Sequence, residues 1–391
     1  MIRTAQAYLA LLLCVLSLLC LSPAHARDSQ EPVPVTPQAK QDGSRWRLGY
    51  VGSGVFSEYP LTLRAMVDGL VQLGWMELDE PMPKDLEADV LWRWLAKHTH
   101  SDYLTFVADA TWRPGNFDSD KRAPMRKSIQ TRLDDENDVD LIIAMGTWAG
   151  QDMRELGPPV PTIVASTSDA QSAGIVDSIQ DSGRDNLHAR IEPQRYQRQV
   201  RLFHDIVPFQ SLGIVYDDTE TGRVYAAVDD IDQVSSELDF DVVACHATAS
   251  DSTPEQTAED TIACYQELAD KQVDAVYVTF HSGVTKESIK PIARILRKAS
   301  IPSFSMAGAG EVEAGILFSM ATANVSYVGL FHAEAIARVF NGALPRNLDQ
   351  VWVDPAKIAL NLGTARIIGF DPPIDILLAA DEVYESALEE Q

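Results

Sequence analysis

The chain has 391 residues, with 57 acidic and 32 basic side chains and a formal net charge of −25 at pH 7. This length is enough for two domains. The strong negative charge excludes nucleic acid and anionic lipid surfaces as expected partners, because such surfaces attract cationic proteins. After residue 26 no stretch approaches 18 apolar residues, so we do not expect the rest of the chain to span a membrane.

The N-terminus has the pattern of a secretory signal peptide over residues 1–26. Arg3 supplies an early positive charge, residues 8–21 are mainly apolar, and the Ala-His-Ala sequence that ends at Ala26 is typical of a cleavage site. We therefore expect cleavage near Ala26 and a mature protein in the periplasm. A retained N-terminal anchor is the alternative.

Residues 27–45 hold three prolines and a glycine among mostly polar side chains, which is typical of a disordered linker. From residue 46 onward, short apolar runs that predict strands alternate with segments of helical spacing. The first half predicts strands at 47–52, 103–107, 141–145 and 162–165, and helices at 59–73, 86–97, 125–133 and 149–156. The second half predicts strands at 211–216, 241–245, 275–280, 301–305, 315–319 and 351–354, and helices at 193–204, 223–238, 254–271, 289–298 and 326–341. This order predicts an α/β fold of two doubly wound, Rossmann-like lobes.

Polar side chains follow two neighbouring strands of the expected first sheet. Thr147 comes just after the strand 141–145, and the strand 162–165 is followed by Ser166, Thr167, Ser168 and Asp169. In parallel sheets ligands bind beyond the carboxyl ends of the strands, so we expect these residues to contact a ligand. The alternative is that they are helix caps and turn residues, which favour the same side chains.

Other strand ends supply further candidates. Ser53 follows the first strand, and Phe56 and Trp148 are candidates for stacking on a flat ligand, although either could belong to the core. The expected contacts from the second lobe are Tyr216, Thr219, Thr221, His281, Ser282, Met306 and Ala307. The Gly-Ser-Gly sequence at 52–54 lacks the third glycine and the acidic residue of a dinucleotide site, so we expect no cofactor.

Cys245 and Cys264 are the two cysteines that remain after the expected cleavage. In an oxidising compartment such a pair predicts one disulfide bond, and a strand end and the next helix can come within bridging distance. Two separate buried thiols are the alternative. The spacing fits no zinc motif, and we expect no metal site.

Four stretches carry a resemblance to a known family. They are DLIIAMGTWAGQ at 140–151, VPTIVASTSDAQSAGIV at 160–176, IPSFSMAGAGEVEAGIL at 301–317 and LPRNLDQVWVDPAKIALNLGTARIIGFDPP at 344–373. The last is the most specific, with a closing strand, an Asn-x-x-x-Ala segment and a Gly-x-x-x-Pro ending. From about residue 47 to 382 the sequence resembles the ABC-transporter substrate-binding family that includes the bacterial tryptophan- and tyrosine-binding proteins.

The resemblance implies a type I periplasmic-binding-protein fold, in which two lobes joined by three crossings hold the ligand between them. We expect crossings near Ala165, Gly315 and Pro345. Lobe 1 is then 46–165 with 316–345, and lobe 2 is 166–315 with 346–391.

The implied function is a monomeric periplasmic protein that captures a small-molecule solute and delivers it to an ABC permease in the inner membrane. A ligand-sensing domain acting on a membrane receptor is one alternative. A cleft enzyme built on His281 and Asp169 is another, but the chain has no Gly-x-Ser-x-Gly nucleophile motif. His281 stands where the family usually has an aspartate, which favours an acceptor-bearing or anionic ligand over an ammonium group.

Overall fold

The computed structural model describes residues 33–249, 252–322, 325–353 and 356–385. The expected signal peptide and residues 27–32 of the expected linker lie outside this part of the chain. Both lobes belong to the compact unit that begins at Val35. None of the described helices is long and apolar enough to cross a bilayer.

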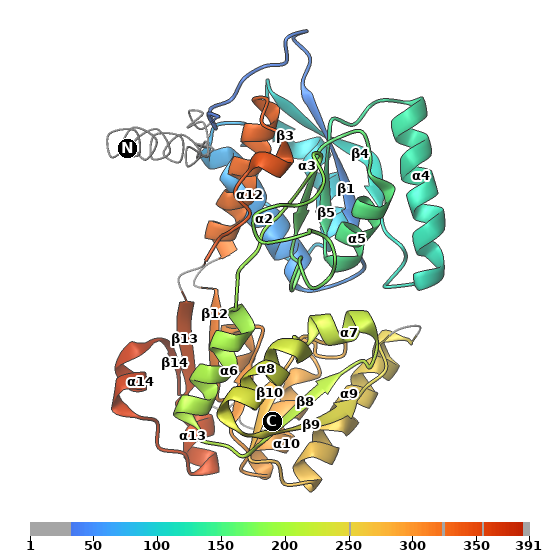
Figure 1. The fold of residues 1–391 in the computed structure, drawn as a ribbon. Helices are drawn as coiled ribbons and strands as arrows, with labels where there is room; N and C mark the ends of the chain where they lie inside the picture. Colours follow the sequence, from blue (N-terminus) through green and yellow to red (C-terminus); the bar gives the residue numbers. More distant parts are fainter. Residues whose placement is uncertain (1–32, 250–251, 323–324, 354–355, 386–391) are drawn as a thin grey trace, which may run out of the picture. The chain divides into compact units, whose positions relative to one another are not determined.

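The first lobe is built on a sheet of five parallel strands in the order β4-β1-β5-β6-β7 (Figure 1). Its strands are β1 Trp46–Gly52, β4 Leu104–Trp112, β5 Leu141–Met145, β6 Thr162–Ala165 and β7 Leu187–Ala189. Its helices are α2 Glu58–Gln72, α3 Ala88–His98, α4 Arg122–Asp135, α5 Thr147–Leu156 and α12 Val325–Phe340. Shorter elements are β2 Glu77–Leu78, β3 Thr99–His100, η1 Ser119–Lys121 and η2 Pro345–Asn347.

Helices cover both faces of this sheet, which explains why β5 is apolar and buried along its whole length. Leu141 and Ile143 face a core formed with α2, α3 and α12, whereas Ile142 and Ala144 face a second core formed with α4 and α5. The strand order is that of a doubly wound sheet, so the expected fold class is confirmed for this lobe.

The second lobe has a sheet of seven strands in the order β14-β13-β12-β11-β10-β8-β9. Its strands are β8 Ser211–Tyr216, β9 Asp241–His246, β10 Ala275–Val278, β11 Ser303–Ser305, β12 Phe318–Thr322, β13 Ala356–Asn361 and β14 Ala380–Tyr384. The pairing is parallel except between β12 and β13. Its helices are α6 Arg195–Ile206, α7 Glu220–Tyr225, α8 Val228–Leu238, α9 Pro254–Asp270, α10 Ile289–Lys298, α11 Ala309–Glu313, α13 Leu362–Ile368 and α14 Ile374–Ala379.

The expected disulfide bond is present in the second lobe. Cys245 near the end of β9 is bonded to Cys264 on α9, with Cα atoms 5.5 Å apart. Both residues are buried in the core that α9 and α10 form with one face of the sheet. The bond therefore fastens α9 to an edge strand of the sheet.

The lobe boundaries expected from the sequence are wrong in two places. The strand β7 pairs with β6, Ile163 opposite His188, so the chain stays in the first lobe beyond Ala165. The strand β12 pairs with β11, Phe304 opposite Phe318, so the segment after Gly315 still belongs to the second lobe. Both errors have one cause. Hydrogen bonding to a neighbouring strand determines the lobe to which a strand belongs, and the sequence of a short strand does not indicate which strand that neighbour is.

The described elements therefore change lobe between β7 and α6, between β12 and α12, and between Val351 and β13. The expected third crossing near Pro345 comes too early, because η2 still packs beside β7 and Ile191 forms an isolated parallel bridge with Val351. Of the expected strand 351–354, only Val351 is paired in this way; residues 352 and 353 are not in a strand, and residue 354 lies outside the described residues. The expected helix 223–238 is two helices, which separate where Ala227 adopts a positive φ of 52°.

Residues 35–45 are not the disordered linker that their composition predicts. The indole nitrogen of Trp75 donates to the carbonyl oxygen of Val35 over 2.8 Å, and Lys40 forms an ion pair of 2.7 Å with Asp140. The side-chain amide of Asn341 donates to the carbonyl oxygen of Thr36. These contacts fix the segment to the first lobe.

Candidate functional site

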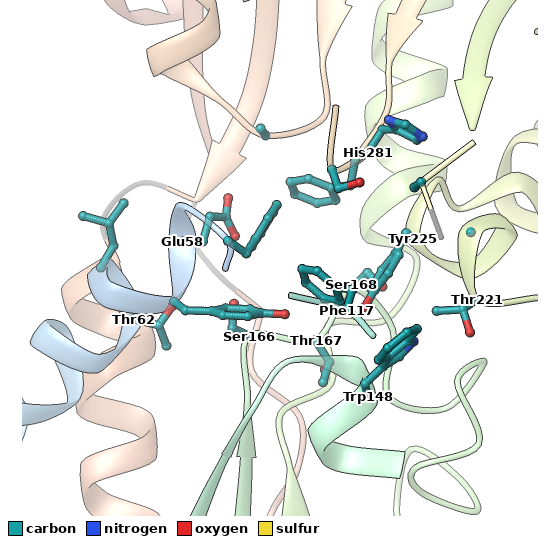
Figure 2. A pocket seen from close by; sticks show the side chains of 18 of the residues that line it. Glu58, Thr62, Phe117, Trp148, Ser166, Thr167, Ser168, Thr221, Tyr225 and His281 are labelled. Atoms are coloured by element: carbon teal, nitrogen blue, oxygen red, sulfur yellow. The ribbon is translucent and has the colours of Figure 1, made fainter. Parts of the chain in front are cut away.

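Each sheet has a switch point, the position at which its strand order reverses, and both switch points lie at one cavity shared by the two lobes. In the first lobe the strand order reverses at β1, which lies beside β5, and in the second it reverses at β8, which lies beside β10. Ligands of doubly wound sheets bind in the crevice beyond the carboxyl ends of such strands. A cavity of about 280 Å³ lies there, lined by residues that follow β1, β5, β6, β8 and β10 (Figure 2).

Most of the predicted site residues line this cavity. They are Phe56, Trp148, Ser166, Thr167, Ser168, Thr219, Thr221, His281, Ser282 and Ala307. The cavity lining does not include Ser53, Thr147, Asp169, Tyr216 and Met306. The reason is the same for four of these five residues: each side chain has internal partners that hold the strand ends or neighbouring loops.

Ser53 supports the turn after β5 from behind. Its buried hydroxyl donates to the carbonyl oxygen of Met145 and accepts from the amide of Ala149, both over 3.0 Å. Gly146 lies within that turn with φ 95°, and a Cβ atom there would collide with the hydroxyl groups of Tyr59 and Ser53. The turn is therefore a position for glycine, and Ser53 has a structural role.

Asp169, Tyr216 and Met306 are also held by neighbouring groups. The Asp169 carboxylate accepts from the amide of Gln171 at 2.8 Å and closes its own turn. The Tyr216 ring packs against His246, with ring centroids 4.7 Å apart. The sulfur of Met306 accepts from the amide of Phe280 over 3.2 Å, so it positions a pocket residue without reaching the pocket.

His281 lines the cavity, but both of its ring nitrogens are bonded inside the second lobe. Nε2 donates to the carbonyl oxygen of Ala247 over 3.0 Å, and Nδ1 accepts from the amide of Gly283 over 3.0 Å. Burial lowers the pKa of His281, so the ring is neutral at pH 7. Figure 2 shows the ring pointing away from the cavity. The interpretation of His281 as a hydrogen-bonding ligand residue therefore does not fit its geometry.

Aromatic rings form much of the cavity wall. They are Phe56, Tyr59, Phe117, Trp148, Tyr196, Tyr225 and Phe280. Phe280 has ring neighbours on two sides, with centroids 6.4 Å away at Tyr196 and 6.2 Å away at Phe56. Phe56 in turn meets Tyr59 at 5.3 Å, so these four rings make a continuous row that runs from the second lobe to the first.

Some buried polar atoms at the cavity have no hydrogen-bond partner in the described parts of the chain. They are the Trp148 indole nitrogen and the Ser168 hydroxyl. The Tyr225 hydroxyl of the second lobe interacts with the Thr147 hydroxyl just behind the wall, although neither oxygen forms a hydrogen bond of ordinary geometry within the described residues. Burial raises the pKa of Tyr225 to about 12, so its hydroxyl keeps its proton at pH 7. Unpaired buried polar groups are costly, and a bound solute would satisfy them.

Four charged residues at the cavity, Glu58, Arg190, Arg195 and Asp217, were not among the predicted site residues. Glu58 is the first residue of α2 and Arg195 the first residue of α6. Burial raises the pKa of the Glu58 carboxyl, although the positive charges of Arg195 and Arg190 oppose that rise. Figure 2 shows Glu58 on the opposite side of the cavity from Tyr225 and Thr221. Glu58 and Arg195 each stand at the start of a helix that follows a strand. This position is the weak sequence signal by which they could have been predicted as site residues.

Comparison with solved structures shows what the fold resembles. A conserved domain protein from Vibrio cholerae O1 biovar El Tor is 18% identical, with a TM-score of 0.63 over 87% of this chain and 100% of that one. The L-Trp-bound ABC domain from Streptococcus pneumonia is 19% identical, with the same score and coverage. A ligand-free, open substrate-binding protein from Clostridium difficile is 18% identical, with a TM-score of 0.57 over 87% and 100%.

At these identities the structural likeness shows the fold, which is that of type I periplasmic binding proteins. No curated protein matches the sequence. The family model described as ABC transporter substrate binding protein matches residues 120–384, which is more than half of the chain. The chain therefore belongs to the ABC transporter substrate-binding protein family.

Proposed function

We propose that this protein is a periplasmic solute-binding protein that encloses a small organic solute between its lobes and delivers it to an ABC permease. The observation that carries the proposal is the cavity at the two switch points, which residues of both lobes line and where the Trp148 indole nitrogen and the Ser168 hydroxyl lack partners among the described residues. Trp148 belongs to the first lobe and Tyr225 to the second, so a solute bonded to both would stabilise the closed arrangement.

The three crossings between the lobes support this mechanism, because so few connections allow rotation about a hinge. Membership of the family supports the transport role, since family members bind solutes for ABC transporters. The aromatic wall favours a solute with a flat or apolar part. We further propose that the mature protein acts as a monomer.

Native mass spectrometry of the protein purified from its own periplasm tests the proposal directly. We expect a monomer that carries a small organic molecule, released on denaturation. Small-angle scattering should show a smaller radius of gyration with that molecule than after its removal. A strain that lacks the gene should lose uptake of the same molecule. Binding without loss of uptake in that strain would favour the receptor-bound sensor over the transport protein.

A further inference from the structure

The guanidinium of Arg195 is weakly neutralised at the cavity wall. Its side chain is 16% exposed, and its ion pair with Glu192 is long, at 3.8 Å. Glu192 makes shorter ion pairs with Arg190, at 2.8 Å, and with Arg198, at 2.7 Å. One carboxylate is thus shared by three guanidinium groups, and the hydrogen-bonded partners of that carboxylate are the other two arginines.

The nearby acidic side chain does not cancel this positive charge by contact. Glu58 lines the same cavity but forms no ion pair within 4.0 Å in the part of the chain that the structure describes. Burial favours its neutral form, as the direction of its pKa shift shows. The Arg195 side of the cavity therefore attracts a negative charge.

The same guanidinium lies at one end of the aromatic row. The Cζ atom of Arg195 is 5.5 Å from the ring centroid of Tyr196, and Tyr196 leads through Phe280 to Phe56. A solute with a ring and a short acidic side chain can contact the row and the guanidinium together. The unpaired Trp148 N–H and the hydroxyl groups of Ser168 and Tyr225 offer further donors to such a solute.

We propose that the solute is an aromatic carboxylate without an α-ammonium group, whose carboxylate binds Arg195 and whose ring lies against Tyr196, Phe280 and Phe56. This inference rests on the proposed function, because it assigns the ligand of the same cavity. An ammonium group is disfavoured there, because the residue at position 281 is a neutral histidine bonded elsewhere and Glu58 stands in the field of two arginines. The other carboxylate of the cavity lining, Asp217, accepts a hydrogen bond of 3.1 Å from the amide of Ala249.

A matched ligand series separates the chemical classes. Four probes share an indole ring and differ in the side chain: indole-3-propionate, indole-3-propionamide, tryptamine and L-tryptophan. The protein is unfolded, freed of bound solute, refolded and titrated with each probe by calorimetry. We expect the carboxylate to bind about 10- to 100-fold more tightly than the amide or the amine, because charge-assisted hydrogen bonds are the stronger ones. Tighter binding of L-tryptophan than of indole-3-propionate would overturn the proposal, since the ammonium would then contribute.

Two arginine variants test the assigned residue. Arg195→Gln should lose most of the affinity for indole-3-propionate and little of the affinity for indole-3-propionamide. Arg198→Gln is the matched control, because Arg198 pairs with the same Glu192 but is absent from the cavity lining. Arg195→Lys keeps the charge and should retain part of the affinity. Equal losses in the Gln variants, or equal losses for acid and amide in Arg195→Gln, would contradict a direct bond to Arg195.

The outcomes also separate this inference from the proposed function. If the four probes fail to bind, but native mass spectrometry finds another solute that closes the lobes, the aromatic carboxylate is wrong and the solute-binding function stands. If native mass spectrometry finds no solute and none of the probes binds, both are wrong. A copurified aromatic acid that protects Arg195 from modification by phenylglyoxal would support both.

Discussion

The rings of Phe56 and Phe280 meet edge to face across the cavity, with centroids 6.2 Å apart and planes 76° apart. Phe56 follows β1 of the first lobe, and Phe280 follows β10 of the second lobe. Edge-to-face aromatic pairs contribute about 0.5–1.5 kcal/mol beyond the area that they bury. The contact therefore favours the arrangement in which the lobes are together.

Replacing Phe280 by leucine should shift the protein toward an open form. We expect a larger radius of gyration without solute and an affinity for the copurified solute that is lower by about 0.5–1.5 kcal/mol. Phe370→Leu is the control, because Phe370 makes a similar edge-to-face contact with Phe318 inside one lobe. That variant should lower thermal stability and leave the scattering curve unchanged. An unchanged curve for Phe280→Leu would show that the two rings do not hold the lobes.

Tyr225→Phe and Ser53→Ala should have opposite effects on affinity and stability. The phenylalanine removes a buried hydroxyl whose interaction with Thr147 lacks the geometry of an ordinary hydrogen bond, so stability should change little, while affinity should fall by about 0.5–1.5 kcal/mol. The alanine removes two hydrogen bonds behind the cavity, so stability should fall by about 1–3 kcal/mol with affinity retained. Urea unfolding and calorimetric titration measure the two effects. Equal affinities of Tyr225→Phe and the parent protein would place Tyr225 among the structural residues.

Gly329→Ala should push α12 away from α2. The two helices cross where Gly329 meets the backbone of Ala65, and a Cβ atom at Gly329 would overlap that backbone. We expect a loss of about 1–3 kcal/mol in the free energy of unfolding, as is usual for overpacking. Gly310→Ala is the control: Gly310 also lies in a helix, α11, but a Cβ atom there meets nothing within 4 Å. This variant should be neutral or slightly stabilising.

The fold could be predicted from sequence because the central strands β5, β6, β8 and β10 are buried on both faces and carry a nearly continuous apolar signal. The expected bounds of β5 and β6 are those of the structure. The strands β7 and β12 were assigned to the wrong lobes for a different reason. Hydrogen bonds across the sheet join β7 to β6 and β12 to β11, and a short strand gives no information about its partner.

Site residues such as Ser166 and Thr219 were predicted correctly, because a position directly after a strand is enough to bring them to the cavity. Three-dimensional contacts decide the rest. Ser53 looks like a ligand residue in the sequence, but its hydroxyl is used by the backbone of the turn after β5. Arg195 has only the weak signal of a charged residue at a helix start after a strand, and only the folded chain brings the start of α6 to the end of the aromatic row.

Breaking the disulfide bond should lower stability without unfolding the second lobe. Cys245 and Cys264 are 19 residues apart, and closing a loop of that size contributes about 3 kcal/mol in the chain-entropy model. Urea unfolding with and without reductant measures the difference, and the double variant Cys245→Ala/Cys264→Ala should unfold at the same urea concentration in both conditions. Equal stability of the oxidised and reduced parent protein would show that strain offsets the entropic gain.

Acid should destabilise the protein partly through His332, which lies on α12. Its ring is fully buried, and neither nitrogen has a hydrogen-bond partner within the described ranges. Burial lowers the pKa of His332 well below its ordinary value, and His188 and Arg190 add to the effect. Burial also lowers the pKa of His188 and of His281.

The sign of the pH effect follows from these shifts. Below about pH 6.5 an unfolded histidine binds a proton that the folded ring does not, so the free energy of unfolding falls as the pH falls. Each such histidine contributes up to about 1.4 kcal/mol per pH unit between its folded and unfolded pKa values. His332→Leu should therefore make the free energy of unfolding fall less steeply from pH 7.5 to pH 5.5, by the contribution of nearly one bound proton. Urea unfolding across this range decides the matter, and parallel pH profiles for His332→Leu and the parent protein would mean that His332 is already protonated in the fold.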